Sequence, residues 1–216
     1  MKNIPISGSL LSHYKDIILY GDDIPLPGHD TLEMVRDSPR YITRTPGNAG
    51  EAAVVLLIHA SEGIPSIIFI QRSDHILHDK HRGQIAFPGG KREKNESLKK
   101  CAFREMNEGI GVRLCIDHPT RKLSPLHVSV SNFLIHPFVA FKDNLPTLRP
   151  NPEEVAAILD SPLTNLEERY AIHRKDFSVR DKFLKDIPYF KVAGKTLWGA
   201  TALIFSELLY LLRQRK

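Results

Sequence analysis

Two glutamates on one predicted helix are the residues of this 216-residue chain best suited to chemistry. Glu105 and Glu108 are three positions apart, a spacing that puts their carboxylates at neighbouring points on one helix face. Gly89 and Gly90 precede the helix in a turn, where glycine lets the backbone approach a ligand closely. Paired carboxylates beside such a turn suit a hard divalent cation that bridges diphosphate oxygens.

The helix that carries these glutamates has its own start signal and core face. Asn95 or Ser97 can cap its first turn. Apolar residues recur at every fourth position and are expected to pack on a core: Leu98, Ala102, Met106 and Ile110. The glutamates are therefore expected on a helix that is fixed against the rest of the domain.

The stretch from Gly89 to Val112 resembles the Nudix box, G-x5-E-x7-R-E-U-x-E-E-x-G-U, in which U is a bulky aliphatic residue. Eight positions fall on this pattern: Gly90, Glu96, Arg104, Glu105, Met106, Glu108, Gly111 and Val112. The resemblance implies a Nudix pyrophosphohydrolase in which Arg104 orients Glu105. It also implies that Glu105 and Glu108 bind Mg²⁺ or Mn²⁺, with catalytic roles for Glu105, Arg104 and Glu154.

The residues just upstream resemble the signature of the coenzyme A pyrophosphatase branch of that family. Residues 81–90 read HRGQIAFPGG, although the stretch between Arg72 and His81 is two residues longer than the branch pattern. Later segments at 129–133, 151–155 and 198–202 extend the resemblance to about residues 23–212. It implies hydrolysis of coenzyme A or a derivative to 3′,5′-ADP and a 4′-phosphopantetheine species.

Six residues of this region are expected to bind the substrate: Arg72, His81, Arg82, Gln84, Gly89 and Gly90. Arg72 and Arg82 can present guanidinium groups to phosphates, or they are surface arginines near a pocket. His81 contacts a phosphate or the adenine, or it hydrogen-bonds the loop backbone. Glu154 is a further metal ligand or general base, or a surface carboxylate that starts an apolar run.

Gly109 departs from the box, because the second glutamate of its E-E pair is usually a metal ligand. Glycine removes a carboxylate there and weakens the helix by about 1 kcal/mol relative to alanine. Water can complete the coordination of Mg²⁺, which retains waters readily. Two interpretations stay open: an active hydrolase, or a catalytically weakened or inactive Nudix-like protein that binds coenzyme A or a nucleotide.

The surrounding pattern predicts an α+β fold, a Nudix-like α/β/α sandwich with a mixed sheet. Residues 1–48 are expected to form an N-terminal arm packed on a single domain at 49–216, with a helix-like segment at 31–36. Strands are predicted at 52–60, 66–71, 85–87, 123–130, 133–141, 190–192 and 195–198, a loop at 144–152, and a closing helix at 201–214. The charge-rich residues 165–185 are expected to form an exposed, lid-like loop or a solvated surface segment. Trp198 is expected in the core or in a pocket wall.

Composition sets the remaining expectations. Hydrophobic residues make up 42% and charged residues 25%, which is ordinary for a globular protein. The net charge of +5 suits an anionic small-molecule diphosphate substrate, and without a concentrated basic block no nucleic-acid partner is expected. The two cysteines lack a C-x-x-C spacing, which argues against a zinc or redox site. We expect a cytoplasmic protein without a signal peptide or membrane span, and a homodimer stays open.

Overall fold

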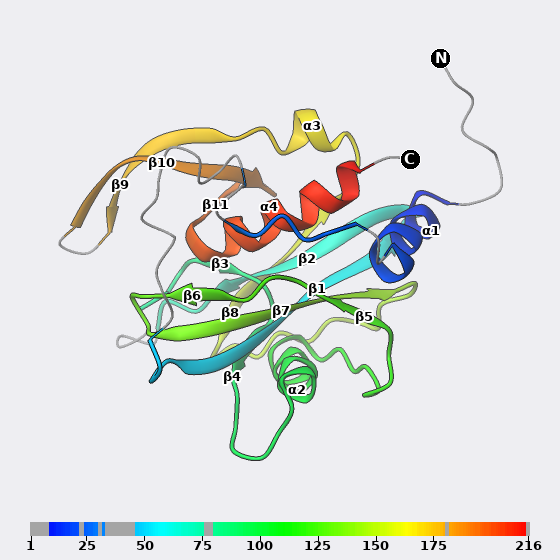
Figure 1. The fold of residues 1–216 in the computed structure, drawn as a ribbon, viewed down its shortest axis with the longest axis horizontal. Coiled ribbons are helices and arrows are strands. Elements are labelled where there is room, and N and C mark those ends of the chain that lie inside the picture. Colours follow the sequence, from blue (N-terminus) through cyan, green and yellow to red (C-terminus); the bar gives the residue numbers. More distant parts are fainter. Residues whose placement is uncertain are drawn as a thin grey trace.

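The computed structural model describes residues 9–21, 24–29, 32, 46–75, 80–179 and 182–214. The segment predicted to be helical at 31–36 lies, apart from Leu32, outside the described residues. The described part of the chain contains a central eight-stranded sheet, a smaller three-stranded sheet and helices on both faces of the central sheet (Figure 1).

The central sheet is mixed, as predicted. Strand β1 (Gly50–Ser61) pairs parallel with β7 (Phe133–Lys142) and antiparallel with β2 (Ile64–Arg72). Five further strands pair antiparallel with these three: β3 (Ile85–Ala86), β4 (Gly89–Lys91), β5 (Thr120–Lys122), β6 (Leu126–Val128) and β8 (Val155–Pro162).

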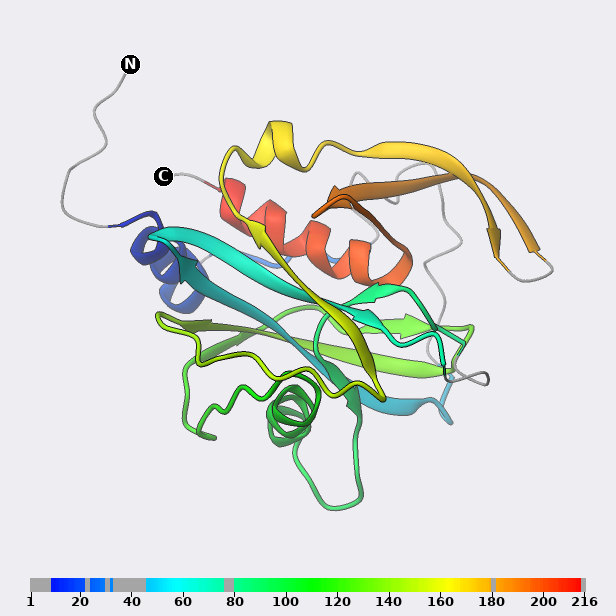
Figure 2. The same ribbon diagram turned by 180° about the vertical axis from the view of Figure 1, so that it is seen from behind.

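Two helices cover opposite faces of this sheet, which gives the predicted sandwich (Figures 1 and 2). Helix α2 (Leu98–Ile110) packs with Val55 and Leu57 of β1, whereas α4 (Gly199–Arg213) shares a core with the alternate residues Leu56 and Ile58. A continuous apolar run such as β1 is typical of a strand that is buried on both faces. The helix that carries the box is therefore fixed to one side of the sheet.

Residues 165–179 and 182–185 do not form a lid-like loop, so that alternative was wrong, whereas their many exposed side chains agree with the alternative of a solvated surface segment. They contain helix α3 (Leu166–Arg169) and strand β9 (His173–Val179), and β9 pairs antiparallel with β10 (Lys182–Val192). β10 also pairs with β11 (Lys195–Trp198), which confirms the hairpin predicted there. Apolar residues of β10 and β11 pack toward α4 and attach the small sheet to the domain.

The strand predicted at 123–130 is shorter in the structure, where only β6 at Leu126–Val128 falls in that range and β5 at Thr120–Lys122 precedes it. Pro125 lies between them and has no N–H to donate to a ladder. The backbone N–H of Ser124 is also diverted, because it donates to the carboxylate of Glu207 on α4 at 2.9 Å. The pairing with β7 is therefore interrupted between Lys122 and Leu126.

The described part of the N-terminal arm packs on the domain. Helix α1 (Leu10–Lys15) continues into the π-helix η1 (Asp16–Tyr20), and Leu11, Tyr14 and Ile18 are buried in the core shared with α4. The hydroxyl of Tyr14 donates to the carbonyl of Leu163 at 2.9 Å. No helix in the described ranges is long and apolar enough to cross a membrane.

Candidate active site

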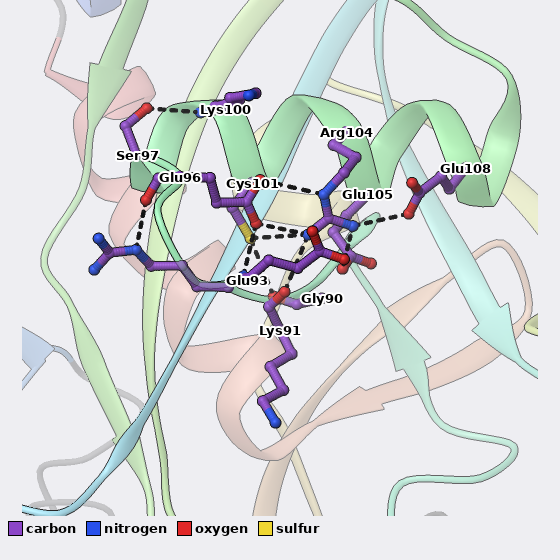
Figure 3. Close-up of polar contacts among 11 residues, drawn as sticks. Gly90, Lys91, Glu93, Glu96, Ser97, Lys100, Cys101, Arg104, Glu105 and Glu108 are labelled. Carbon is purple, nitrogen blue, oxygen red and sulfur yellow. Dashed lines mark hydrogen bonds and ion pairs between the residues drawn. The ribbon is translucent and has the colours of Figure 1, made fainter.

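The glycine turn before α2 makes room for the carboxylate of Glu105. A Cβ atom at Gly90 would collide with that carboxylate, and one at Gly89 would collide with the backbone of β1. Gly89 also has a φ of 153°, which favours glycine. Figure 3 shows Gly90 lying directly against the glutamates of the helix. The two glycines thus allow β4 to lie close to both β1 and α2.

Arg104 is the hub of the polar contacts in the box (Figure 3). One terminal nitrogen, Nη1, donates to Glu105 Oε1 and to Glu108 Oε2, each at 2.9 Å. The other, Nη2, donates to Glu96 Oε1 at 2.7 Å and to the carbonyl of Lys91 at 3.2 Å. A planar guanidinium with five donors can hold several acceptors in fixed positions. Arg104 therefore orients both glutamates and ties them to the turn.

Glu96 anchors the loop between β4 and α2. Its side chain is only 6% exposed, and Oε1 also accepts the backbone N–H of Glu93 at 2.8 Å. The hydrogen bond from Arg104 lowers the pKa of Glu96 to about 2, against the opposing effect of burial. In the sequence, Glu96 was noted only as a match to the box. Its separation of eight residues from Arg104 does not predict a hydrogen bond between the two side chains.

Glu105 lies where negative charge accumulates. Burial raises the pKa of its carboxyl above the ordinary value, while the hydrogen bond from Arg104 opposes the rise. The negative charges of Glu108 and Glu154 add to the rise, so both carboxylates act electrostatically on Glu105. A cation at this position would relieve the repulsion among the three groups.

Glu154 is brought to this region by the pairing of β2 with β8. Its backbone carbonyl accepts the N–H of Ser73 at 2.8 Å, and its own N–H donates to the carbonyl of Asn151 at 3.0 Å. The residue is exposed, at the first turn before β8. Glu154 is thus a surface carboxylate whose negative charge also raises the pKa of Glu105.

The loop of residues 81–84 closes on the end of β2. The N–H of Arg72 donates to the carbonyl of Gln84 at 3.0 Å, and the N–H of Gly83 donates back to Arg72 at 3.2 Å. Within the loop, His81 Nδ1 lies 3.3 Å from Gln84 Oε1. The structure therefore brings together Arg72, His81 and Gln84, whereas the side chain of Arg82 is exposed. Leu77 of the longer stretch lies outside the described residues.

Position 109 faces the segment that carries Glu154. Gly109 is buried, and a Cβ atom there would meet only Val155 Cγ2 at 3.9 Å, an ordinary contact. The carbonyl of Gly109 accepts the N–H of Asn151 at 2.9 Å. A side chain at position 109 would therefore extend toward the start of β8, next to Glu154.

The donor chemistry of the site fits a hard divalent cation. The carboxylates of Glu105 and Glu108 both accept hydrogen bonds from Nη1 of Arg104, so their oxygens lie close together. Mg²⁺ is usually held by one or two carboxylates with water and phosphates. Among the described residues, no three histidine, cysteine or acidic side chains form a ready-made metal cluster. Glu105 and Glu108 would therefore provide part of a coordination shell that water and substrate oxygens complete.

Comparison with known proteins identifies the family. A family model for the NUDIX domain matches residues 49–181. An uncharacterised Nudix hydrolase NudL of Yersinia pestis (strain Pestoides F) is 32% identical over 205 residues, covering 94% of this chain and 95% of the relative. Its counterpart in Yersinia enterocolitica is 33% identical over 167 residues, covering 74% and 80%. A MutT/nudix family protein from Enterococcus faecalis aligns over 93% of this chain and 70% of its own, with 15% identity and a TM-score of 0.49.

The matched region contains the complete site described above, from β1 through the box helix to Glu154. Members of this family are metal-dependent pyrophosphohydrolases of nucleoside diphosphate-linked compounds. Since the family model covers more than half of the chain and the Yersinia pestis relative aligns along nearly all of it, this protein belongs to the Nudix hydrolases.

Proposed function

We propose that this Nudix hydrolase cleaves the diphosphate of coenzyme A or a derivative, releasing 3′,5′-ADP and a 4′-phosphopantetheine species. The observation that carries the proposal is the continuity of the site. The loop of residues 81–84 is hydrogen-bonded to Arg72, and it runs through β3 directly into the glycines that lie against Glu105. The residues that resemble the coenzyme A signature and the acidic cluster are therefore parts of one surface.

Glu105 and Glu108 would hold the metal, Mg²⁺ or Mn²⁺. A bound divalent cation would neutralise charge on the diphosphate oxygens and make a water molecule more acidic. Arg104 keeps both carboxylates in place, and the absence of a Cβ atom at Gly90 leaves Glu105 its position. Arg72 and Arg82 would bind phosphate oxygens through their guanidinium groups.

Glu154 is proposed to supply the carboxylate that the box lacks at Gly109. Position 109 faces the start of β8, so a glutamate there would have reached the region where Glu154 already stands. The charge of Glu154 acts on Glu105, which supports a shared task. Glu154 would act as a further ligand or as the general base that accepts a proton from the attacking water.

A second function is favoured by one observation. The carboxylates of Glu105 and Glu108 both accept hydrogen bonds from Arg104. Among the described residues, no three histidine, cysteine or acidic side chains form a metal cluster. A protein with this site and without turnover would bind coenzyme A or a nucleotide and release it unchanged. The two functions differ in whether 3′,5′-ADP appears.

The deciding experiment measures release of 3′,5′-ADP from coenzyme A with Mg²⁺ and with Mn²⁺. The native chain is compared with Gly109→Glu, and with Gly109→Ala as the control for helix stabilisation. Turnover by the native chain supports the hydrolase. Turnover only in Gly109→Glu supports the binding protein, and no turnover in any of them rejects coenzyme A as the substrate.

The role of Glu154 has a matched control in its neighbour. Both Glu153 and Glu154 are exposed, and the charge of Glu154 is among the main causes that raise the pKa of Glu105. We expect Glu154→Gln to lower kcat by about 10²-fold, in the range typical of a lost acid or base, and Glu153→Gln to change it by less than about twofold. Equal effects of the two substitutions would remove Glu154 from the site.

A further inference from the structure

The small sheet carries a cluster of rings, with the ammonium group of Lys175 among them, on the face turned away from α4. We call it the aromatic–lysine face: His173, Lys175 and Phe177 of β9, Tyr189 of β10 and Trp198 of β11. Tyr189 is the register partner of both His173 and Trp198, so these three side chains stand in one row across the strands. Lys175 and Phe177 follow His173 at alternate positions, which puts them on the same face.

The members of the aromatic–lysine face contact one another closely. The rings of Phe177 and Trp198 stack with centroids 4.7 Å apart, and those of His173 and Tyr189 lie 5.4 Å apart. Lys175 Nζ lies 4.8 Å from the ring centroid of Phe177 and 4.9 Å from that of Tyr189. An ammonium group within about 6 Å of a ring is held by cation–π attraction.

The residues of the small sheet that pack against α4 belong to the other face. The alternate residues Phe190, Val192 and Leu197 point the other way and are buried with α4. The rings of the aromatic–lysine face remain partly exposed, and Lys175 is exposed. Partly exposed aromatic rings with a fixed cation provide a stacking surface for a planar base and a partner for a phosphate.

The strands of the small sheet carry an excess of positive charge. Residues 173–198 contain seven lysines and arginines and three aspartates, a net charge of +4 out of the +5 of the whole chain. One of the aspartates, Asp186, is paired with Arg174 at 2.8 Å. The small sheet is therefore one of two strongly positive stretches of the chain, the other being residues 80–104 with a net charge of +6.

The small sheet also adjoins the candidate active site. β11 packs against β3, and β3 runs through Phe87 and Pro88 into the glycine turn of the box. Figure 1 shows β11 next to β3, and Figure 2 shows the β9–β10 hairpin at the end of the molecule where β3 lies. A substrate with its diphosphate at the box could extend toward the small sheet.

We propose that the aromatic–lysine face binds the adenine nucleotide half of the substrate. The base stacks on the rings of this face, and the ammonium group of Lys175 pairs with a phosphate. This assignment rests on the proposed function, because coenzyme A carries a 3′-phosphorylated adenine nucleotide. A mononucleotide fits better than a polynucleotide, because the row of rings is only three strands wide.

Trp198 provides a direct readout, because it is the only tryptophan in the chain. We would titrate the full chain, without metal, with 3′,5′-ADP and follow the fluorescence of Trp198. Ribose 5-phosphate serves as the ligand that has a phosphate and no base. The expected result is saturable quenching by 3′,5′-ADP and none by ribose 5-phosphate. Equal responses to both, or no saturable response to 3′,5′-ADP, would overturn the proposal.

Two lysines of the small sheet form a matched pair of variants. Lys195 lies two residues before buried Leu197 on β11, so both side chains are on the face opposite to the aromatic–lysine face. We expect Lys175→Met to weaken 3′,5′-ADP binding about tenfold and to raise KM for coenzyme A by a similar factor, with little change in kcat. Lys195→Met removes the same charge and is expected to change either constant by less than about twofold. Tyr189→Leu removes a ring and should also weaken binding about tenfold.

The outcomes separate this proposal from the proposed function. Base-dependent quenching without turnover of coenzyme A would support the nucleotide site and reject the hydrolase activity. Turnover with unchanged KM in Lys175→Met and Tyr189→Leu would keep the activity and reject the nucleotide site. An oligoadenylate that binds more than about tenfold more tightly than 3′,5′-ADP would also reject it, in favour of RNA.

Discussion

At the scale of single residues, the site depends on how one guanidinium is shared. Arg104 donates to Glu96, Glu105 and Glu108 and to a backbone carbonyl of the turn. A lysine offers three donors on a flexible stem and cannot reproduce this planar arrangement. The orientation of the two proposed metal ligands is thus linked to Glu96, which is not itself a proposed ligand.

Glu96→Gln is expected to destabilise the protein in a pH-dependent way. The pKa of Glu96 in the fold is about 2, below its ordinary 4.5, so its charge stabilises the fold above about pH 4.5. That contribution is lost as the pH falls toward about 2. We expect the variant to lose about 1–3 kcal/mol of unfolding free energy at pH 7, and less near pH 3.

Urea denaturation at pH 7 and pH 3 would measure the difference. Glu93→Gln is the control, because the side chain of Glu93 is exposed and only its backbone N–H contacts Glu96. A deficit in Glu96→Gln that stayed the same at both pH values would contradict the assigned ion pair.

Gly90→Ala is expected to damage catalysis more than binding. The added Cβ atom would collide with the carboxylate of Glu105, which must move. Displacement of a positioned group by about 1 Å can cost about 10²-fold in rate, so we expect kcat to fall by about that factor. Gly47→Ala is the control, since a Cβ atom there meets nothing within 4 Å. Steady-state kinetics on both variants would decide, and a Gly90→Ala enzyme with native kcat would show that Glu105 is not catalytic.

At the scale of elements, regular patterns were predictable and long-range contacts were not. The apolar positions at every fourth residue correctly predicted α2, and the structure confirms Ser97 as its N-cap, with Oγ accepting the N–H of Lys100 at 3.2 Å. In the small sheet, the strands at 190–192 and 195–198 were predicted, whereas β9 and the first part of β10 were missed because charges interrupt their alternation. The contact of Ser73 with Glu154 joins residues far apart in sequence, and only the pairing of β2 with β8 creates it.

Two glycines of α2 should respond to alanine with opposite signs. Gly109 is inside the helix with space for a Cβ atom, so Gly109→Ala should raise the unfolding free energy by about 1 kcal/mol. Gly111 is the C-cap with a φ of 76°, and a Cβ atom there would lie 3.2 Å from Arg149 Cβ. Gly111→Ala should therefore lower it by about 1 kcal/mol or more. Thermal or urea unfolding tests both, and a stabilising Gly111→Ala would contradict the observed cap.

At the scale of the whole molecule, the N-terminal arm is part of the domain's core. Leu11, Tyr14 and Ile18 share the apolar cluster that joins α4 to the central sheet. The predicted boundary at residue 48 separates the arm in sequence, but these residues bury their side chains in the domain. Stability of the sheet and attachment of the arm are consequently coupled.

One side chain of the central sheet makes that coupling testable. Arg121 of β5 donates to the carbonyls of Gly21 at 2.9 Å and Ile24 at 2.6 Å, just after η1. A cation at the C-terminal end of a helix satisfies carbonyls that have no partner within it. We expect Arg121→Ala to lower the unfolding free energy by about 1–3 kcal/mol.

Hydrogen exchange would show where that loss occurs. In Arg121→Ala, amides of residues 10–21 should exchange faster, while those of α2 keep their protection, because local opening requires only the arm to detach. Lys122→Ala is the control, since Lys122 is exposed on the same strand. Uniformly faster exchange over the whole chain would mean that the arm and the domain unfold as a single unit, and that Arg121 supports the fold as a whole.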